Sequence, residues 1–221
     1  MQYFNEDFLA FFKELAANNN KDWFDTNRKR YEANVKKPFE VYVTDLIAEV
    51  QGLDKRIEIT YKEAIFRINR DIRFSKNKEP YKLTRSAIIS PKGRKDKAFP
   101  GLYIELGPAH YRVYGGVYQP DKHQLYTIRE AIAENPGKFN KMIAEKSFTA
   151  TFGEIRGEKN KVIPKEFKPV AEKAPLIYNK QFYWFAEFQP ELIESDKLLQ
   201  TTMDAYKANK KVMDFFAQGM E

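Results

Sequence analysis

The spacing of apolar residues changes twice along this chain, and this change restricts the possible folds more than any other feature. A helical period runs through residues 8–50 and returns over residues 199–216. Between them, residues 102–106 and 111–117 alternate apolar and polar side chains, as half-buried antiparallel strands do. The pattern predicts an α+β fold: a central, mostly antiparallel sheet flanked by helices, with a helical N-terminal segment and a C-terminal helix.

Local signals predict where the elements begin. Asn5 suits the N-cap of the first helix, Pro38 suits the first turn of a later one, and Ser195 is expected near the start of the last helix. Gly115-Gly116, within the second alternating run, predicts a bulge or a close approach by another backbone or a ligand. Further strands are expected at residues 86–90, 148–155 and 182–188.

Length and composition set broad limits. The 221 residues contain no repeat or long linker, so a single domain over residues 1–221 is expected. There is no cysteine, which excludes disulfides, thiolate catalysis and cysteine-ligated metals. The N-terminus has acids where a signal peptide needs positive charge, and no apolar run approaches the ~20 residues of a membrane span. We therefore expect a cytoplasmic protein without a membrane partner.

Positive charge is concentrated in one segment. Residues 67–97 contain eleven Lys and Arg against three Asp and Glu, a net charge of +8, whereas the whole chain carries +7. The stretch FRINRDIRFSKNKEPYK, residues 66–82, holds three arginines and three lysines with only two acids. An excess of this kind attracts anions such as phosphate, carboxylate or nucleic acid.

The arginines of this stretch favour recognition of a fixed geometry. Arginine offers five donors in a rigid fork that matches two oxygens at once, whereas lysine supplies a mobile point charge. Asp71 lies between Arg70 and Arg73 and can orient one of them without neutralising the rest. The predicted ligand-binding residues are Arg67, Arg70, Asp71, Arg73, Lys76, Lys78, Tyr81, Lys82, Tyr118 and Arg129.

The conformation of this stretch is expected to be a short strand over residues 64–69, followed by an irregular loop over residues 71–81 that is rich in turn formers. A structural alternative stays open at this point. In it, the arginines pair with acids elsewhere in the chain, such as Glu63 or Glu105, and bind no ligand.

The same residues carry a resemblance to a known family. The motif Arg67-x-x-Arg70-Asp71-x-Arg73-Phe74, followed by Asn77-Lys78-x-x-Tyr81, resembles the signature of a bacterial family, domain of unknown function 2461. Three further segments are similar to it, so that the resemblance extends over most of the chain: NNNKDWF (18–24), GGVYQP (115–120) and TIR (127–129). This chain has Tyr114-Gly115-Gly116 where the family has a triple glycine. The resemblance implies that the arginine segment is important, but the family has no assigned activity.

Common catalytic motifs are absent from the sequence: there is no P-loop, G-x-G-x-x-G, G-x-S-x-G or H-E-x-x-H. His110 and His123 are the only histidines and lack metal-ligand spacing, so neither a metal nor a cofactor is expected.

Three functions remain. The first is binding of a small phosphate- or carboxylate-bearing ligand in a pocket centred on residues 67–81, with or without catalysis. The second is nucleic-acid binding through residues 67–97, where aromatic residues interleave with cations. The third is a structural or partner-binding role with internally paired arginines.

Overall fold

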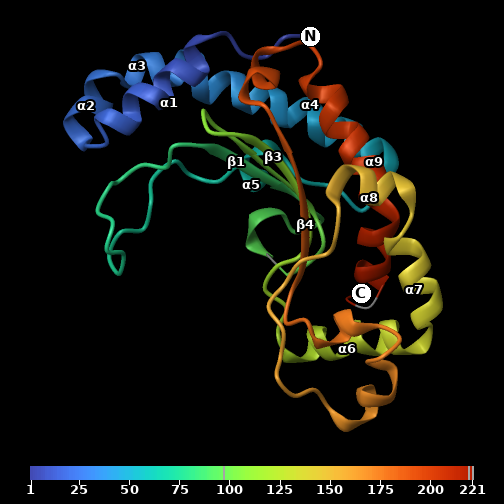
Figure 1. Ribbon diagram of the computed structural model, residues 1–221. Coiled ribbons are helices and arrows are strands. Elements are labelled where there is room, and N and C mark those ends of the chain that lie inside the picture. The colour runs from blue at the N-terminus through green and yellow to red at the C-terminus, as the bar shows by residue number, and fades with distance from the viewer. Residues whose placement is uncertain (97, 219, 221) are drawn as a thin grey trace.

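The computed structural model describes residues 1–96, 98–218 and 220 (Figure 1). Lys97, which the basic segment includes, lies outside them. The helices are α1 (Asp7–Ala17), α2 (Lys21–Thr26), α3 (Arg28–Tyr31), α4 (Lys37–Leu53), α5 (Tyr61–Ala64), α6 (Lys122–Glu134), α7 (Pro136–Ile143), α8 (Lys146–Phe152) and α9 (Leu198–Gln218). The strands are β1 (Arg85–Ile89), β2 (Leu102–Leu106), β3 (Tyr111–Val117) and β4 (Phe182–Phe188). The π-helical turn η1 (Glu32–Lys36) joins α3 to α4, and the 3-10 turns are η2 (Gly93–Lys95), η3 (Lys165–Val170), η4 (Pro175–Tyr178) and η5 (Pro190–Glu194).

The four strands form one antiparallel sheet in the order β1-β2-β3-β4. Alternate residues of β2 and β3 are buried and the others are half-buried, which gives the sheet an inner and an outer face. Helices α4 and α9 contact each other and pack against β1 and β3 (Figure 1). A buried polar contact joins these layers, since the Tyr42 hydroxyl of α4 lies 2.7 Å from Thr202 Oγ1 of α9 and 3.4 Å from the Tyr111 hydroxyl of β3. The predicted α+β class is confirmed.

Two predicted helix starts fall in the turn just before the helix. Asn5 Oδ1 accepts a hydrogen bond from the Asp7 backbone nitrogen at 3.2 Å, where α1 begins. Ser195 Oγ accepts one from the Lys197 backbone nitrogen at 3.1 Å, ahead of the start of α9 at Leu198. Pro38 lies in the first turn of α4, as predicted.

The strand predicted at residues 148–155 is wrong, because this segment forms most of α8. A short apolar run does not distinguish a strand from a buried helix by its period. Here tertiary packing decides: Phe148 and Phe152, four residues apart, lie on one helical face and are both buried. The Phe148 ring packs edge-on against Trp184 of β4, with centroids 5.4 Å apart.

The glycines of β3 allow β4 to approach closely. A Cβ on Gly115 would lie 2.6 Å from Trp184 Nε1, and one on Gly116 would lie 2.1 Å from the Phe182 carbonyl oxygen. Gly116 also has a φ of 122°, a conformation that favours glycine. Strand pairing runs unbroken through both positions, so the predicted close approach is made by the neighbouring strand.

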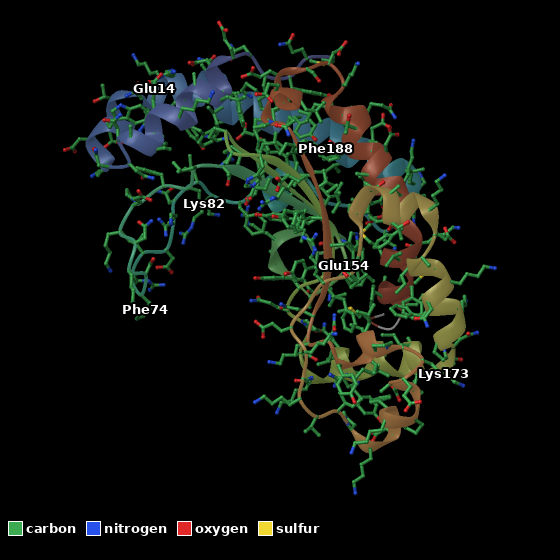
Figure 2. The ribbon with its side chains drawn as sticks, in the orientation of Figure 1. Glu14, Phe74, Lys82, Glu154, Lys173 and Phe188 are labelled. Carbon is green, nitrogen blue, oxygen red and sulfur yellow. The ribbon has the colours of Figure 1, made fainter. Side chains whose placement is uncertain are left out.

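Residues 64–69 do not contain the predicted continuous strand. Helix α5 ends at Ala64, and only isolated bridges follow, from Ile65 to Ala87 and from Asn69 to Tyr81. Beyond the second bridge, residues 70–80 form an irregular loop, here called the basic loop, which projects from the body (Figure 1). Phe74 lies at its tip, 96% exposed (Figure 2).

Candidate functional site

A cavity of about 590 Å³ lies where the basic loop joins the body. One wall is the helix that runs without interruption through α3, η1 and α4, here called the long helix; the other comes from α5 and the residues flanking the basic loop. Two acidic side chains, Glu32 and Glu40, line it. Six cationic side chains also line it: Arg28, Lys36, Lys62, Arg67, Arg85 and Arg94. Six positive against two negative side chains leave the lining at +4, which favours an anionic occupant.

Arg85 is the most buried of these cations, with 4% of its surface exposed. Strand β1 places its guanidinium 5.1 Å from the centre of the Phe39 ring of α4, and its Nη1 donates to the Phe66 carbonyl oxygen at 3.1 Å. Its Nε is buried and has no hydrogen-bond partner in the described part of the chain. Burial lowers the pKa of Arg85, while the nearby Tyr31 and Glu40 oppose that shift. A buried guanidinium with an unused donor calls for an acceptor, which either a water molecule or a ligand can supply.

The long helix contributes four charged side chains at intervals of four residues: Arg28, Glu32, Lys36 and Glu40. In a regular α-helix, each step of four residues exceeds a full turn by about 40°, so the first and last would diverge by about 120°. The π-helical hydrogen bonds of η1 place more residues in a turn and reduce this divergence. The turn therefore keeps all four charges, alternating in sign, on the side that faces the cavity.

The opposite wall holds Arg94 and Arg67 in different ways. Arg94 Nη1 donates to the carbonyl oxygens of Lys62 at 2.7 Å and Ile65 at 2.5 Å, which ties η2 to the end of α5. Arg67 is exposed and makes no ion pair within the described residues, although its charge contributes to lowering the pKa of Asp71. Arg67 is therefore available to a ligand in the cavity.

Tyr81 marks the edge of the cavity and is fixed by the N-terminal helices. Its ring stacks on Phe24 of α2 with centroids 4.1 Å apart and planes inclined by 15°. The Asn19 side chain accepts from the Tyr81 backbone nitrogen at 3.1 Å and donates to its carbonyl oxygen at 3.0 Å, much as a neighbouring strand would. The segment 18–24 thus holds the chain where it returns from the basic loop.

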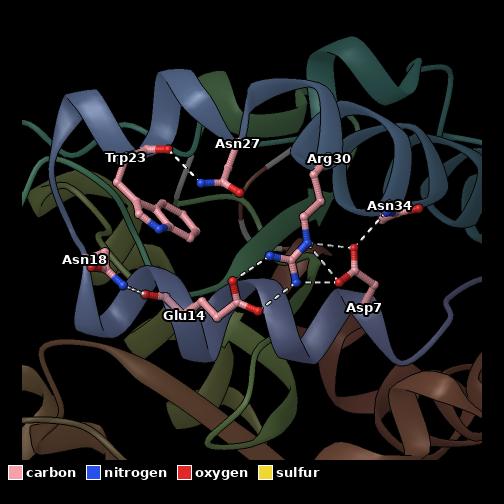
Figure 3. A network of polar contacts seen from close by, with 7 residues as sticks. All are labelled: Asp7, Glu14, Asn18, Trp23, Asn27, Arg30 and Asn34. Atoms are coloured by element: carbon pink, nitrogen blue, oxygen red, sulfur yellow. Dashed lines mark hydrogen bonds and ion pairs between the residues drawn. The ribbon is translucent and has the colours of Figure 1, made fainter.

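Arg30 holds the long helix against α1 (Figure 3). Its Nε lies 2.9 Å from both oxygens of Asp7, and its Nη1 lies 2.6 Å from Glu14 Oε2. Asn34 donates a further hydrogen bond to Asp7 at 2.7 Å. The hydrogen bond from Arg30 is the main reason why the pKa of Asp7 lies below its usual value. These contacts set the distance of the cavity wall from the first helix.

Of the ten predicted ligand-binding residues, Arg67 and Tyr81 line the cavity together. Most of the other predicted residues form their contacts with residues in the basic loop or next to it. Asp71 pairs with Arg73 at 2.7 Å, Arg70 with Glu79 at 3.6 Å, and Lys78 donates to the Ile72 carbonyl oxygen at 3.1 Å. The remaining residues of the loop region also lie outside the cavity lining: Lys76 is exposed, and Lys82 lies 5.5 Å from the centre of the Phe66 ring.

Tyr118 and Arg129, the two predicted residues outside the basic segment, lie apart from the cavity. Tyr118 is exposed beside Tyr183 of β4, with ring centroids 6.3 Å apart. Arg129 of α6 is buried and donates to the carbonyl oxygens of Ile177 at 2.9 Å and Asn179 at 3.3 Å. Arg129 therefore holds α6 to the segment around η4.

Several cavity residues were not predicted from the sequence: Arg28, Glu32, Lys36, Glu40, Lys62, Arg85 and Arg94. Arg85 and Arg94 lie within the basic segment, but nothing in their spacing distinguishes them from its other cations. The four-residue interval of alternating charge in residues 28–40 was a usable signal, although such intervals also occur on solvated helices.

Two further findings concern the chemistry of the described residues. His110 Nε2 lies 2.9 Å from Glu105 Oε1, and no group of three or more His, Asp or Glu side chains there has an arrangement that holds a metal. Nor does any helix in this part of the chain combine the length and apolar character needed to cross a membrane.

The fold and the site together define an α+β protein with a cation-lined cavity beside a projecting basic loop. The chain belongs to the family described as conserved hypothetical protein (DUF2461), whose model matches residues 7–215. No curated protein matches the chain.

Proposed function

We propose that the cavity binds a small molecule through a phosphate or carboxylate group held by Arg85. The observation that carries this proposal is the buried Arg85 Nε, which lines a cavity of net positive charge and has no acceptor among the described residues. Arg67, exposed and without an ion pair in the same part of the chain, would contact the same anion. Two guanidinium groups suit the paired oxygens of phosphate or carboxylate.

The carboxylates of Glu32 and Glu40 restrict the ligand further. Both are half-buried on the long helix and make no ion pair or hydrogen bond among the described residues. A bare anion would be repelled by them, whereas a hydroxyl or ammonium group would satisfy them. The ligand class that fits is a small phosphate ester or carboxylate that also bears hydroxyl or ammonium groups, such as a sugar phosphate or an amino acid.

A thermal-shift screen with Arg85→Met tests the proposal. Sugar phosphates, phosphoamino acids and dicarboxylates would be screened against the wild type. A ligand at about 100 times its Kd adds about 2.7 kcal/mol, or roughly 5–10 °C for a chain of this size. The shift should disappear in Arg85→Met, because methionine keeps the contact with Phe39 but has no donors. Arg73→Met is the matched control, because Arg73 is paired with Asp71 outside the cavity.

The unliganded Arg85→Met protein separates the proposal from a structural role. Since Arg85 has no carboxylate partner within ion-pair distance in the described chain, its replacement should change the free energy of unfolding by only about 1 kcal/mol, in either direction. If the screen gives no shift with the wild type and Arg85→Met instead unfolds the protein, the arginine is structural and the proposal is wrong.

A further inference from the structure

A row of aromatic rings crosses the outer face of the sheet. Tyr103, Tyr114 and Phe185 are direct cross-strand partners on β2, β3 and β4. Their ring centroids are 5.5 Å and 5.1 Å apart along the row. Phe66 extends the row beyond β1, with its centroid 5.9 Å from that of Tyr103. All four side chains are half-buried, in contrast to the buried residues of the inner face.

Cations lie over both ends of this row. The Arg156 guanidinium is 4.1 Å and that of Arg112 is 5.1 Å from the centre of the Phe185 ring. At the other end, Lys82 Nζ is 5.5 Å from the centre of the Phe66 ring. Arg156 makes no ion pair within the described residues, and its guanidinium lies over the Phe185 ring.

The two carboxylates of this face have partners of different kinds. Glu187 pairs with Arg112 at 2.6 Å, and Glu105 lies 2.9 Å from His110 Nε2. Next to the rings, Glu105, Arg112 and Glu187 form a second cross-strand row. Glu105 lies opposite Arg112, and Arg112 lies opposite Glu187. The rings are thus bordered by a row in which Glu187 is ion-paired with Arg112 and Glu105 is hydrogen-bonded to His110, with cations at the two ends of the rings.

An outer sheet face is usually polar, so a continuous row of rings in that position calls for an explanation. Packing of the rings on one another accounts for their spacing but not for the cations at both ends. Nucleobases stack on aromatic rings irrespective of their sequence, and phosphates pair with adjacent cations. A four-stranded antiparallel sheet with rings on its open face can present several such surfaces side by side.

We infer that the outer face of the sheet binds single-stranded nucleic acid, with bases against Tyr103, Tyr114 and Phe185 and phosphates at Arg156. Charge complementarity favours this occupant over a neutral oligosaccharide, since the chain carries +7 and the cations flank the rings. A duplex does not fit, because its bases are stacked on each other and their faces are covered. The inference is independent of the cavity proposal, which rests on the inner-face residue Arg85.

Fluorescence anisotropy with labelled oligothymidine and oligouridine of about 12 nucleotides tests this inference. Tyr103→Leu and Tyr114→Leu, which keep apolar bulk but remove the ring, should each weaken binding about tenfold. Arg156→Gln should weaken it and reduce the slope of log affinity against log salt by about 0.7. Tyr126→Leu is the control, because Tyr126 is an exposed tyrosine on α6, where it contacts Glu166 and Phe167.

Three results would overturn the inference. The first is that the wild type does not bind the oligonucleotides at about 50 mM salt. The second is that the ring variants and Tyr126→Leu lose affinity equally. The third is that a neutral oligosaccharide binds and competes with the oligonucleotide. Where Tyr103→Leu does not fold, as judged by circular dichroism, Phe185→Leu removes a ring from the end of the same row and replaces it in the test.

Discussion

Arg85 and Arg73 show how position decides what an arginine does. Arg73 is exposed and forms two hydrogen bonds with Asp71 only two residues away, so its charge is already satisfied. Arg85 is buried and, among the described residues, donates to a carbonyl oxygen and lies over a ring. Surface ion pairs contribute about 0–1 kcal/mol, whereas a buried charge without a partner carries a desolvation cost that a bound anion would partly offset. The cavity proposal therefore depends on Arg85 more than on the exposed arginines.

At the residue scale, we predict that Asp7 makes stability depend on acid pH. Arg30 lowers the pKa of Asp7 in the folded state relative to the unfolded chain, where it is about 3.9. The stabilisation is therefore present above that pH and is lost as the pH falls through the lower folded-state pKa. Urea unfolding from about pH 6 to about pH 2.5 should show a shallower loss of stability in Asp7→Asn than in the wild type.

Arg30→Met provides the second arm of this experiment. It removes the main hydrogen-bond partner of Asp7, which should make the pH profile as shallow as that of Asp7→Asn. Each variant should also lower stability near pH 7 by about 1 kcal/mol, the scale of a half-exposed bidentate pair. Identical profiles for wild type and both variants would show that this pair does not determine the acid dependence.

Glu40→Gln tests the selectivity proposed for the cavity. Glu40 faces the same space as Arg85, so its removal should raise the affinity for inorganic phosphate several-fold by relieving repulsion. The affinity for a hydroxyl- or ammonium-bearing ligand should fall instead, because glutamine is a weaker acceptor for such groups. Isothermal titration with both probes measures the two changes, and a change of the same sign for both would contradict the proposed selectivity.

At the scale of elements, the basic loop depends on a contact far away in the sequence. Asn19 makes two hydrogen bonds with the Tyr81 backbone, and the bridge between Asn69 and Tyr81 closes the loop at that point. Inside the loop, most contacts are between residues two to nine positions apart. The loop is therefore a locally organised unit attached to the body through its base.

We predict that Asn19→Ala loosens this attachment. The loss of two partly buried hydrogen bonds should cost about 1–2 kcal/mol and increase amide hydrogen exchange over residues 69–82. Binding in the cavity should weaken as well, since Tyr81 and Arg67 lie at the base of the loop. Asn18→Ala is the control, because Asn18 only donates to the Glu14 carbonyl oxygen in an exposed position. Equal exchange in the two variants would show that Asn19 does not anchor the loop.

Strands were predictable wherever one face is buried, because alternation along β2 and β3 records that burial directly. The helical conformation of residues 148–152 was not predictable from the sequence, because it depends on packing against Trp184, which lies far away along the chain. The candidate site divides in the same way. The excess of positive charge indicated the segment that contains Arg67 and Tyr81. The burial of Arg85 could not be predicted in this way, because it depends on the pairing of β1 with β2 and on the approach of α4.

At the scale of the whole molecule, most of the buried hydrophobic residues form one connected core. It includes residues from the N-terminal segment, the long helix, all four strands and α9, from Phe4 to Phe216. Aromatic contacts link distant parts of it, such as Phe182 of β4 and Phe216 of α9 with centroids 5.0 Å apart. A core of this kind favours a single folding unit.

We therefore propose that the chain is a single domain and predict one cooperative unfolding transition. Differential scanning calorimetry should give equal calorimetric and van't Hoff enthalpies, as expected when no intermediate accumulates. Near-ultraviolet and far-ultraviolet circular dichroism should give the same midpoint. Two resolved transitions, with α1 to α4 melting separately from the sheet, would show that the helical N-terminal segment is a second unit.

The π-helical turn η1 has a consequence for how this family varies. The turn contains Glu32–Lys36, and the charges on either side of it face the cavity only because it is wound more loosely than an α-helix. A relative with one residue fewer here could form an uninterrupted α-helix and still keep its charges on this side, because the looser turn accommodates about one extra residue. A relative of the same length that winds this stretch as a regular α-helix would instead turn Arg28 away from Glu40 by about 120°. The winding of this stretch, as much as its charges, should therefore distinguish relatives that share the cavity from those that do not.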